Sequence, residues 1–167
     1  MILVYTGNGK GKTSACLGQV VRALGSGLRV AFAQFMKESG CAGEQQVLER
    51  LLGADFLAGG CGFFRREDER PRHRSAAEQT LLWARRQLAD HDMLILDESL
   101  YALRAGLLLR EELESLLLEA REKSCHVVLS GRGAPDWLLE TADLVTSMEE
   151  IRHPWQKGLP AVPGVDF

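Results

Sequence analysis

The sequence predicts an α/β protein with three layers, in which a mostly parallel β-sheet carries helices on both faces. Short apolar runs that suit buried strands alternate along the chain with amphipathic segments of helical period. Connections that contain a helix are long enough to cross over a sheet and join parallel strands. Because no repeat, linker or shift in composition interrupts this alternation, we expect a single domain over residues 1–167.

The predicted elements cover most of the chain. Continuous apolar runs predict strands at residues 2–6, 28–35, 54–57, 93–96, 126–129 and 144–148. Apolar residues spaced three and four apart predict helices at residues 17–24, 43–52, 75–88, 111–121 and 135–141. Ser75 and Glu78 form a capping box that starts the third of these helices, after an exposed loop at 65–74. The tail at 153–167 holds three of the five prolines, so we expect it to run extended over the surface without a helix.

Composition and charge exclude several classes of protein. The formal charge of −3 argues against a nucleic-acid-binding protein held by a broad basic field. No apolar run approaches the ~18–20 residues needed to cross a bilayer, and the N-terminus lacks the pattern of a secretory signal. The four cysteines are isolated from one another, which favours buried, reduced thiols without a structural metal. We therefore expect a cytoplasmic protein with no membrane or nucleic-acid partner.

The strongest functional signal lies between the first predicted strand and the first predicted helix, in the segment Thr6-Gly7-Asn8-Gly9-Lys10-Gly11-Lys12-Thr13-Ser14. Glycines let backbone N–H groups turn inward around an anion, and the following helix N-terminus adds positive potential. In such a loop Lys12 lies along the β- and γ-phosphates, and the Thr13 hydroxyl holds Mg²⁺. Thr6 occupies the place where the P-loop pattern has its first glycine. We predict a P-loop nucleotide-binding domain of the RecA-like type, and a glycine-rich turn without a ligand is the alternative.

Two further loops are expected at the same edge of the sheet. The apolar run at 93–96 delivers Asp97 and Glu98 at the carboxyl end of a strand, where parallel sheets place their ligand sites. One of these acids would bind Mg²⁺ directly or through water, and the residues alone leave open which of them does. Arg132 lies between two glycines after the run at 126–129 and can reach a phosphate in the cleft. An exposed arginine in a surface turn is the alternative there.

Several segments occur in an order that is similar to one known family: Gly7 to Thr13, Gln34-Phe35-Met36-Lys37, Leu96-Asp97-Glu98, Gly131-Arg132-Gly133-Ala134, Ala142-Asp143-Leu144-Val145-Thr146, and Lys157-Gly158 followed by Gly164-Val165-Asp166-Phe167. Together they resemble the corrinoid adenosyltransferases of the P-loop type. The resemblance covers nearly the whole chain, and the combination is far more specific than any one segment.

The resemblance implies that the substrates are ATP and a reduced corrinoid. In this family cobalt(I) attacks the 5′ carbon of the ribose and displaces triphosphate, in the biosynthesis or salvage of adenosylcobalamin. The resemblance also implies Mg²⁺ as the cofactor, an electron-donating flavoprotein as the source of cobalt(I), and a homodimer. Whether the corrinoid is complete cobalamin or a biosynthetic precursor stays open.

The resemblance assigns roles to individual residues as well. The segment 7–13 with Ser14 holds the triphosphate, and Lys10, Lys12 and Arg132 stabilise its charge as it leaves. A second lysine inside the loop suits a leaving group that carries the charge of three phosphates. Because cobalt(I) is itself the nucleophile, no serine, cysteine or histidine base is needed.

For the metal, the resemblance favours Thr13 with Glu98, and Asp97 is the alternative ligand. On the corrinoid side, Phe63 matches a loop in which an aromatic ring helps to expel the lower axial ligand of cobalt. The alternative is that Phe63 and Phe64 simply anchor a loop onto the core.

Two departures from the family pattern affect the corrinoid side. The family has a tryptophan two places after the phenylalanine, where this chain has Arg65. Many members also carry an N-terminal extension that helps to cover the corrinoid cleft in a dimer, whereas the first strand is expected here from Ile2. We therefore expect the cover of the cleft either to come from another part of the protein or to be missing.

Two other classes share parts of this pattern. A nucleoside kinase of the thymidine-kinase type also joins a glycine loop to an Asp-Glu strand end, but this chain lacks the paired CxxC motifs of the usual zinc lobe. A small regulatory or motor ATPase would use the same loop, but 167 residues leave little room for a partner-binding region.

Overall fold

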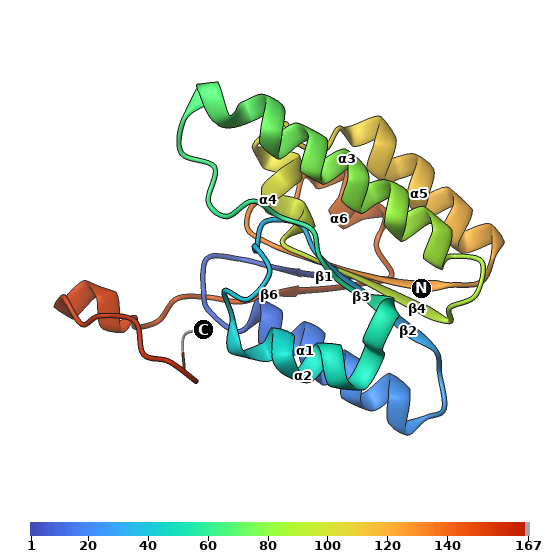
Figure 1. The fold of residues 1–167 in the computed structure, drawn as a ribbon, viewed down its shortest axis with the longest axis horizontal. Helices are drawn as coiled ribbons and strands as arrows, with labels where there is room; N and C mark the ends of the chain where they lie inside the picture. Colours follow the sequence, from blue (N-terminus) through green and yellow to red (C-terminus); the bar gives the residue numbers. More distant parts are fainter. Residues whose placement is uncertain (166–167) are drawn as a thin grey trace.

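The chain forms a six-stranded sheet between two layers of helices, in a computed structural model that describes residues 1–165 (Figure 1). The strands are β1 (Ile2–Thr6), β2 (Val30–Gln34), β3 (Phe56–Ala58), β4 (Met93–Asp97), β5 (His126–Ser130) and β6 (Leu144–Ser147). Their order is β3-β2-β4-β5-β1-β6, and every neighbouring pair is parallel. The carboxyl ends of all these strands therefore lie along one edge of the sheet.

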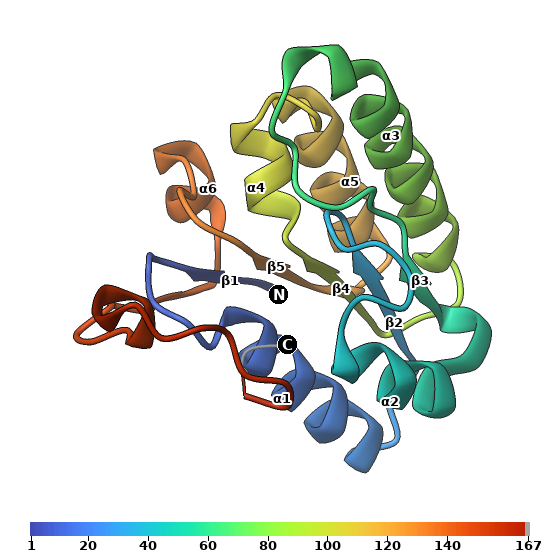
Figure 2. The same ribbon diagram turned by 60° about the vertical axis from the view of Figure 1, so that its left-hand side comes forward.

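Helices cover both faces of the sheet, as the sequence predicts. In Figures 1 and 2, α1 and α2 lie on one face, and α3, α4, α5 and α6 lie on the other. Their bounds are α1 (Lys12–Gly25), α2 (Gly43–Leu52), α3 (Arg70–Gln87), α4 (Ser99–Arg104), α5 (Arg110–Glu122) and α6 (Asp136–Thr141). Short 3₁₀ turns lie at η1 (Gly53–Asp55), η2 (Glu67–Glu69) and η3 (Pro154–Lys157).

Alternate residues of the central strands divide between two apolar cores. Leu3 and Phe32 pack with the buried side of α1, whereas Val4 and Ala33 pack with α3 and α5. Successive side chains of a strand point to opposite faces, so a strand that is covered on both faces must be apolar throughout. This requirement explains the continuous apolar runs of β1, β2 and β4. Their burial holds the carboxyl ends of the strands in a fixed arrangement.

The prediction of an exposed loop at 65–74 is wrong in its second half. Helix α3 begins at Arg70, with Pro71 in its first turn, and not at a cap on Ser75. Arg74 lies against α5, where its guanidinium donates to the Leu107 carbonyl (2.8 Å) and to both carboxylate oxygens of Glu112. The dense charge of this segment therefore forms ion pairs along a helix rather than a solvated loop.

Other differences are local. Helix α4 follows Glu98 directly and was not expected from the sequence. Strand β3 begins at Phe56, since the preceding residues form a 3₁₀ turn, and the tail contains the short turn η3 instead of being extended throughout. All four cysteines are free, but Cys41 is exposed, contrary to the expectation of burial. Within residues 1–165, no helix is long and apolar enough to cross a membrane.

We predict that Arg74→Met lowers the free energy of unfolding by about 1–2 kcal/mol, because it removes a two-pronged, partly buried ion pair and a bond to a carbonyl. The matched control is Arg72→Met. The Arg72 side chain is 70% exposed and lies 3.8 Å from Glu38, so its loss should cost less than ~0.5 kcal/mol. Urea denaturation of the three proteins measures the difference, and equal effects of both substitutions would contradict the role of Arg74.

Candidate active site

A cleft of about 580 Å³ opens at the carboxyl edge of the sheet. Its walls come from the loop after β1, from the residues that follow β2, β4 and β5, and from the start of α2. Phe63 and the tail residues Gly164 and Val165 complete the lining. Ligand sites of parallel sheets lie at this edge, and the structure places most of the predicted site residues in this one cleft.

The glycine loop joins β1 to α1 and curls around the Lys12 side chain. The Lys12 ammonium donates to the carbonyl oxygens of Gly7 (2.9 Å) and Gly9. Burial and the neighbouring Arg132 lower the pKa of Lys12. Two cations are therefore held close together, an arrangement that an anion in the cleft would stabilise.

The opposite side of the glycine loop packs against the chain that leaves β6. The Gly9 N–H donates to the Met148 carbonyl (2.8 Å), and the Met148 N–H donates to Thr6 (2.9 Å). A Cβ on Gly7 would lie 2.3 Å from the Met148 carbonyl oxygen, and one on Gly9 would lie 2.6 Å from that of Glu149. Glycine is therefore required at both positions by close backbone contact, independently of any ligand.

The structure also explains the threonine in place of the first P-loop glycine. Thr6 is the last residue of β1 and is buried, and its hydroxyl accepts a hydrogen bond from the Ala134 N–H (3.3 Å). The turn of the loop begins at Gly7, which has a φ of 96°. Thr6 thus connects β1 to the loop that follows β5.

The predicted loop residues do not all face the cleft. Residues Gly9 to Ser14 line it, including the exposed Lys10 and Ser14. Gly7 and Asn8 are not part of the lining that the described residues form, and Asn8 is exposed. Gly7 contributes through its carbonyl oxygen, which accepts from Lys12.

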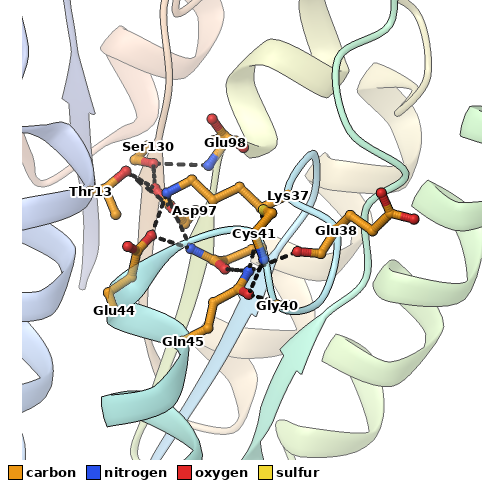
Figure 3. Close-up of polar contacts among 11 residues, drawn as sticks. Thr13, Lys37, Glu38, Gly40, Cys41, Glu44, Gln45, Asp97, Glu98 and Ser130 are labelled. Atoms are coloured by element: carbon orange, nitrogen blue, oxygen red, sulfur yellow. Dashed lines mark hydrogen bonds and ion pairs between the residues drawn. The ribbon is translucent and has the colours of Figure 1, made fainter. Parts of the chain in front are cut away.

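Asp97 is the centre of the polar contacts at the cleft floor (Figure 3). It is fully buried at the end of β4 and accepts hydrogen bonds from the hydroxyls of Thr13 (3.1 Å) and Ser130 (2.5 Å). It also accepts from the amide of Gln34 (3.2 Å). Three elements thus meet on one carboxylate: the start of α1, the end of β5 and the end of β2.

Glu98 has the opposite environment. Its Oε2 atom is buried and has no hydrogen-bond partner among residues 1–165. Burial and the adjacent Asp97 raise the pKa of Glu98 to about 7. Its backbone has a φ of 60°, a conformation that residues other than glycine rarely adopt, and the Ser130 hydroxyl fixes it by accepting from the Glu98 N–H (3.0 Å). An unsatisfied carboxylate oxygen in a cleft is a strong indication of a ligand.

Arg132 lies at the edge of the cleft and is exposed. The preceding Gly131 has a φ of 141°, and a Cβ there would lie 2.8 Å from Leu100. The turn therefore fits tightly against α4 and holds the backbone of Arg132 in place, while its exposed side chain remains beside the cleft.

The two phenylalanines after β3 differ in their surroundings. Phe64 packs against the core, with its ring centroid 5.4 Å from that of His73. Phe63 lines the cleft and is 75% exposed, with the Arg65 guanidinium 5.7 Å from its ring centroid. Phe64 therefore anchors the loop onto the core, whereas Phe63 presents an apolar ring at the mouth of the cleft.

Sequence reasoning missed a group of polar residues on the side of Asp97 that faces away from the glycine loop. Lys37 and Glu44 line the cleft and form an ion pair of 2.6 Å. Behind them Gln45, 1% exposed, accepts from the backbone N–H groups of Gly40 and Cys41 and donates to Gln34. Lys37 belongs to one of the segments that carry the family resemblance, but the sequence alone gives this lysine no role.

A divalent cation fits part of this arrangement. The Thr13 hydroxyl lies beside Asp97, and the buried Glu98 Oε2 atom is unused. Residues 1–165 contain no group of three or more His, Cys, Asp or Glu side chains that could hold a metal ion. Hard cations such as Mg²⁺ accept one or two carboxylates and take further ligands from phosphate and water.

The fold and the cleft together define a P-loop protein: a parallel α/β sheet whose first strand leads through a glycine- and lysine-rich loop into a helix, facing buried acids at the end of β4. The family described as "ATP:corrinoid adenosyltransferase BtuR/CobO/CobP" matches residues 1–167. The chain belongs to this family. The family is named for adenosyl transfer, which favours an adenosyltransferase over a nucleoside kinase or a regulatory ATPase for this cleft.

Individual relatives agree with the family match. A corrinoid adenosyltransferase of Pseudomonas aeruginosa is 38% identical over 172 residues, which cover 100% of this chain and 83% of that protein. The corrinoid adenosyltransferase of Escherichia coli (strain K12) is 36% identical over 169 residues, covering 100% of this chain and 85% of that protein. Among solved structures, the flagellar accessory protein FlaH from Methanocaldococcus jannaschii has a similar fold, with a TM-score of 0.53. It is 12% identical, and the match covers 87% of this chain and 69% of that one.

The pKa of Glu98 predicts how stability depends on pH. In the unfolded chain this carboxyl ionises near its ordinary value of 4.5, whereas in the folded chain it keeps its proton up to about pH 7. Between these values the folded state binds more protons, so the free energy of unfolding should fall as pH rises, by at most ~3 kcal/mol. Glu98→Gln should remove most of this decline, measured by denaturant unfolding from about pH 5 to about pH 8 without nucleotide or metal.

The control for this measurement is Glu111→Gln, on the exposed side of α5. It should leave the pH dependence of the wild-type protein in place. A Glu98→Gln variant with the same decline as the wild type would show that Glu98 ionises in its ordinary range.

Proposed function

We propose that the protein transfers the 5′-deoxyadenosyl group of ATP to the cobalt(I) of a reduced corrinoid and releases triphosphate, in the biosynthesis or salvage of adenosylcobalamin. Membership of the corrinoid adenosyltransferase family supports this proposal. The observation that carries it is the Lys12 ammonium within the glycine loop, which faces the buried carboxylates at the end of β4. In this proposal residues 1–167 act as one adenosyltransferase domain.

The chemistry forms one bond and breaks one. The cobalt(I) electron pair attacks the 5′ carbon of the ribose, the bond from that carbon to the bridging oxygen breaks, and its electron pair leaves on triphosphate. Cobalt is formally oxidised by two electrons, and no proton has to be removed. The protein therefore needs no general base, and its main task is to orient ATP and stabilise the departing charge.

The glycine loop supplies this stabilisation. Gly7, Asn8, Gly9 and Gly11 shape the loop, and Lys12 can exchange the carbonyl oxygens of Gly7 and Gly9 for phosphate oxygens. Lys10 and Arg132 line the cleft beside it and extend the positive wall, and Ser14 adds a neutral hydroxyl there. The whole triphosphate leaves, so several cations serve better than the single lysine that contacts a γ-phosphate.

Mg²⁺ fits the acid side of the cleft and would neutralise part of the triphosphate charge. We assign Thr13 and Glu98 as its protein ligands, because Glu98 has the one buried side-chain oxygen without a partner among residues 1–165. Asp97 already accepts hydrogen bonds from Thr13, Ser130 and Gln34. We therefore assign to it the role of orienting the Thr13 hydroxyl, and not that of a direct metal ligand.

We assign Phe63 to the corrinoid side. Its exposed ring at the mouth of the cleft supports contact with the flat, apolar underside of a corrinoid, from which a water or nitrogen ligand would be displaced. Arg65 lies over this ring at the place where the family has a tryptophan, and it can widen the same surface by cation–π contact.

Three expectations concern the setting of the reaction and stay predictions. A flavoprotein would supply the electrons that produce cobalt(I), the enzyme would act as a homodimer, and it would work in the cytoplasm.

The decisive assay mixes the protein with Mg-ATP and anaerobically reduced cobalamin. We expect a light-sensitive cobalt–carbon product and inorganic triphosphate in equal amounts, followed by the corrinoid spectrum and by phosphate analysis. Release of ADP or orthophosphate with an unchanged corrinoid spectrum would instead indicate a kinase or an ATPase.

Lys12→Ala should lower the rate of adenosylation by at least ~100-fold, because it removes the charge at the centre of the loop. The matched control is Lys123→Ala, since Lys123 caps α5 at the edge of the sheet opposite the cleft. Circular dichroism and a thermal melt check that both variants are folded. A folded Lys12→Ala protein with near-normal turnover would overturn the assignment of the triphosphate to this loop.

A further inference from the structure

Lys37 is a cleft residue to which neither the P-loop pattern nor the reaction assigns a role. It follows β2, on the side of β4 away from the glycine loop, because the strand order places β4 between β2 and β5. Its side chain is 22% exposed and lines the cleft together with Lys12 and Glu98. Figure 3 shows it reaching over Asp97 toward Glu44.

Glu44 holds the Lys37 ammonium in place. The Glu44 carboxylate accepts from Lys37 (2.6 Å) and from the Gln34 amide (3.1 Å). Desolvation by burial disfavours the charge on Lys37, but Asp97 and Glu44 outweigh it and raise the pKa of Lys37. Lys37 therefore stays protonated, and its long side chain is oriented before any ligand arrives.

The ammonium of Lys37 is only partly satisfied. An ammonium group has three N–H donors, and within residues 1–165 the only hydrogen bond that the Lys37 ammonium donates is to Glu44. Asp97 is 3.6 Å away, which is an ion pair but too long for a hydrogen bond. A mostly buried ammonium with unused donors beside an open cleft lacks an acceptor that a ligand could supply.

We propose that Lys37 contacts the triphosphate of ATP directly and grips it from the side opposite Lys12, Lys10 and Arg132. The proposal rests on the function proposed above, which identifies triphosphate as the anion in the cleft. Triphosphate oxygens provide the missing acceptors, and a cation on each side suits a leaving group that departs whole. Glu44 is then a positioning residue, which keeps the ammonium at the cleft.

A different explanation is that Lys37 only neutralises Asp97 and Glu44. Removing Lys37 would then weaken anion binding because two uncompensated carboxylates repel the ligand. The two explanations differ in the double variant Lys37→Met/Glu44→Gln, which removes one charge of each sign. If Lys37 contacts the anion directly, the double variant should bind the anion as weakly as the single variant. If Lys37 only prevents repulsion, the double variant should recover the affinity of the wild type.

The test is calorimetric titration of the protein with inorganic tripolyphosphate in excess magnesium chloride, which needs neither corrinoid nor turnover. We expect Lys37→Met to bind about tenfold or more weakly, the loss of one charged hydrogen bond. The double variant should bind tripolyphosphate as weakly as Lys37→Met does. Lys123→Met is the matched control and should bind as the wild type does.

Either of two results would overturn the proposal: Lys37→Met binding within about threefold of the wild type, or recovery in the double variant. If Lys37→Met does not fold, as judged by its thermal melt, Lys37→Gln replaces it, because an amide can keep the bond to Glu44 without the charge. The result is separable from the proposed function. A protein that binds tripolyphosphate through Lys37 yet forms no cobalt–carbon product would refute the adenosyl transfer and leave this contact standing.

Discussion

The buried carboxylate of Asp97 is the interaction on which the site depends. Taking a charged group out of water is costly unless hydrogen bonds and counter-charges replace the lost hydration. Here Thr13, Ser130 and Gln34 provide those bonds, and each comes from a different element. The need to satisfy this one carboxylate therefore aligns the start of α1 with the ends of β2 and β5, so the cleft keeps its form before a ligand binds.

The glycine loop is constrained in a complementary way, from both of its sides. Lys12 bonds to its carbonyl oxygens from the cleft, and Met148 pairs with its backbone from the edge of the sheet. The close approach of Met148 and Glu149 leaves no room for a Cβ on Gly7 or Gly9. Strand β6 thus does more than extend the sheet, since the chain that follows it supports the glycine loop.

The sequence predicted the features that rest on local pattern. Continuous apolar runs predicted the strands, and the glycine loop together with the acids at the end of β4 indicated the cleft. It could not predict contacts between distant segments. Arg74 pairs with Glu112, thirty-eight residues away, and no local pattern indicates that contact. Lys37 and Glu44 have no recognisable spacing as a pair, and their role appears only in the fold, where Glu44 pairs with Lys37 and Lys37 lies 3.6 Å from Asp97.

The two adjacent acids at the end of β4 show how one strand end can serve two purposes. Asp97 already accepts hydrogen bonds from Thr13, Ser130 and Gln34, and it cannot turn to a ligand without breaking bonds that hold three elements. Glu98 has a strained backbone, an unpaired buried oxygen and a pKa raised by burial and by Asp97, so a cation would relieve rather than disturb it. If Glu98 binds a cation as proposed, the stability that it costs the free protein would be recovered on binding. We conclude that Asp97 organises the cleft and Glu98 makes it ready for a ligand.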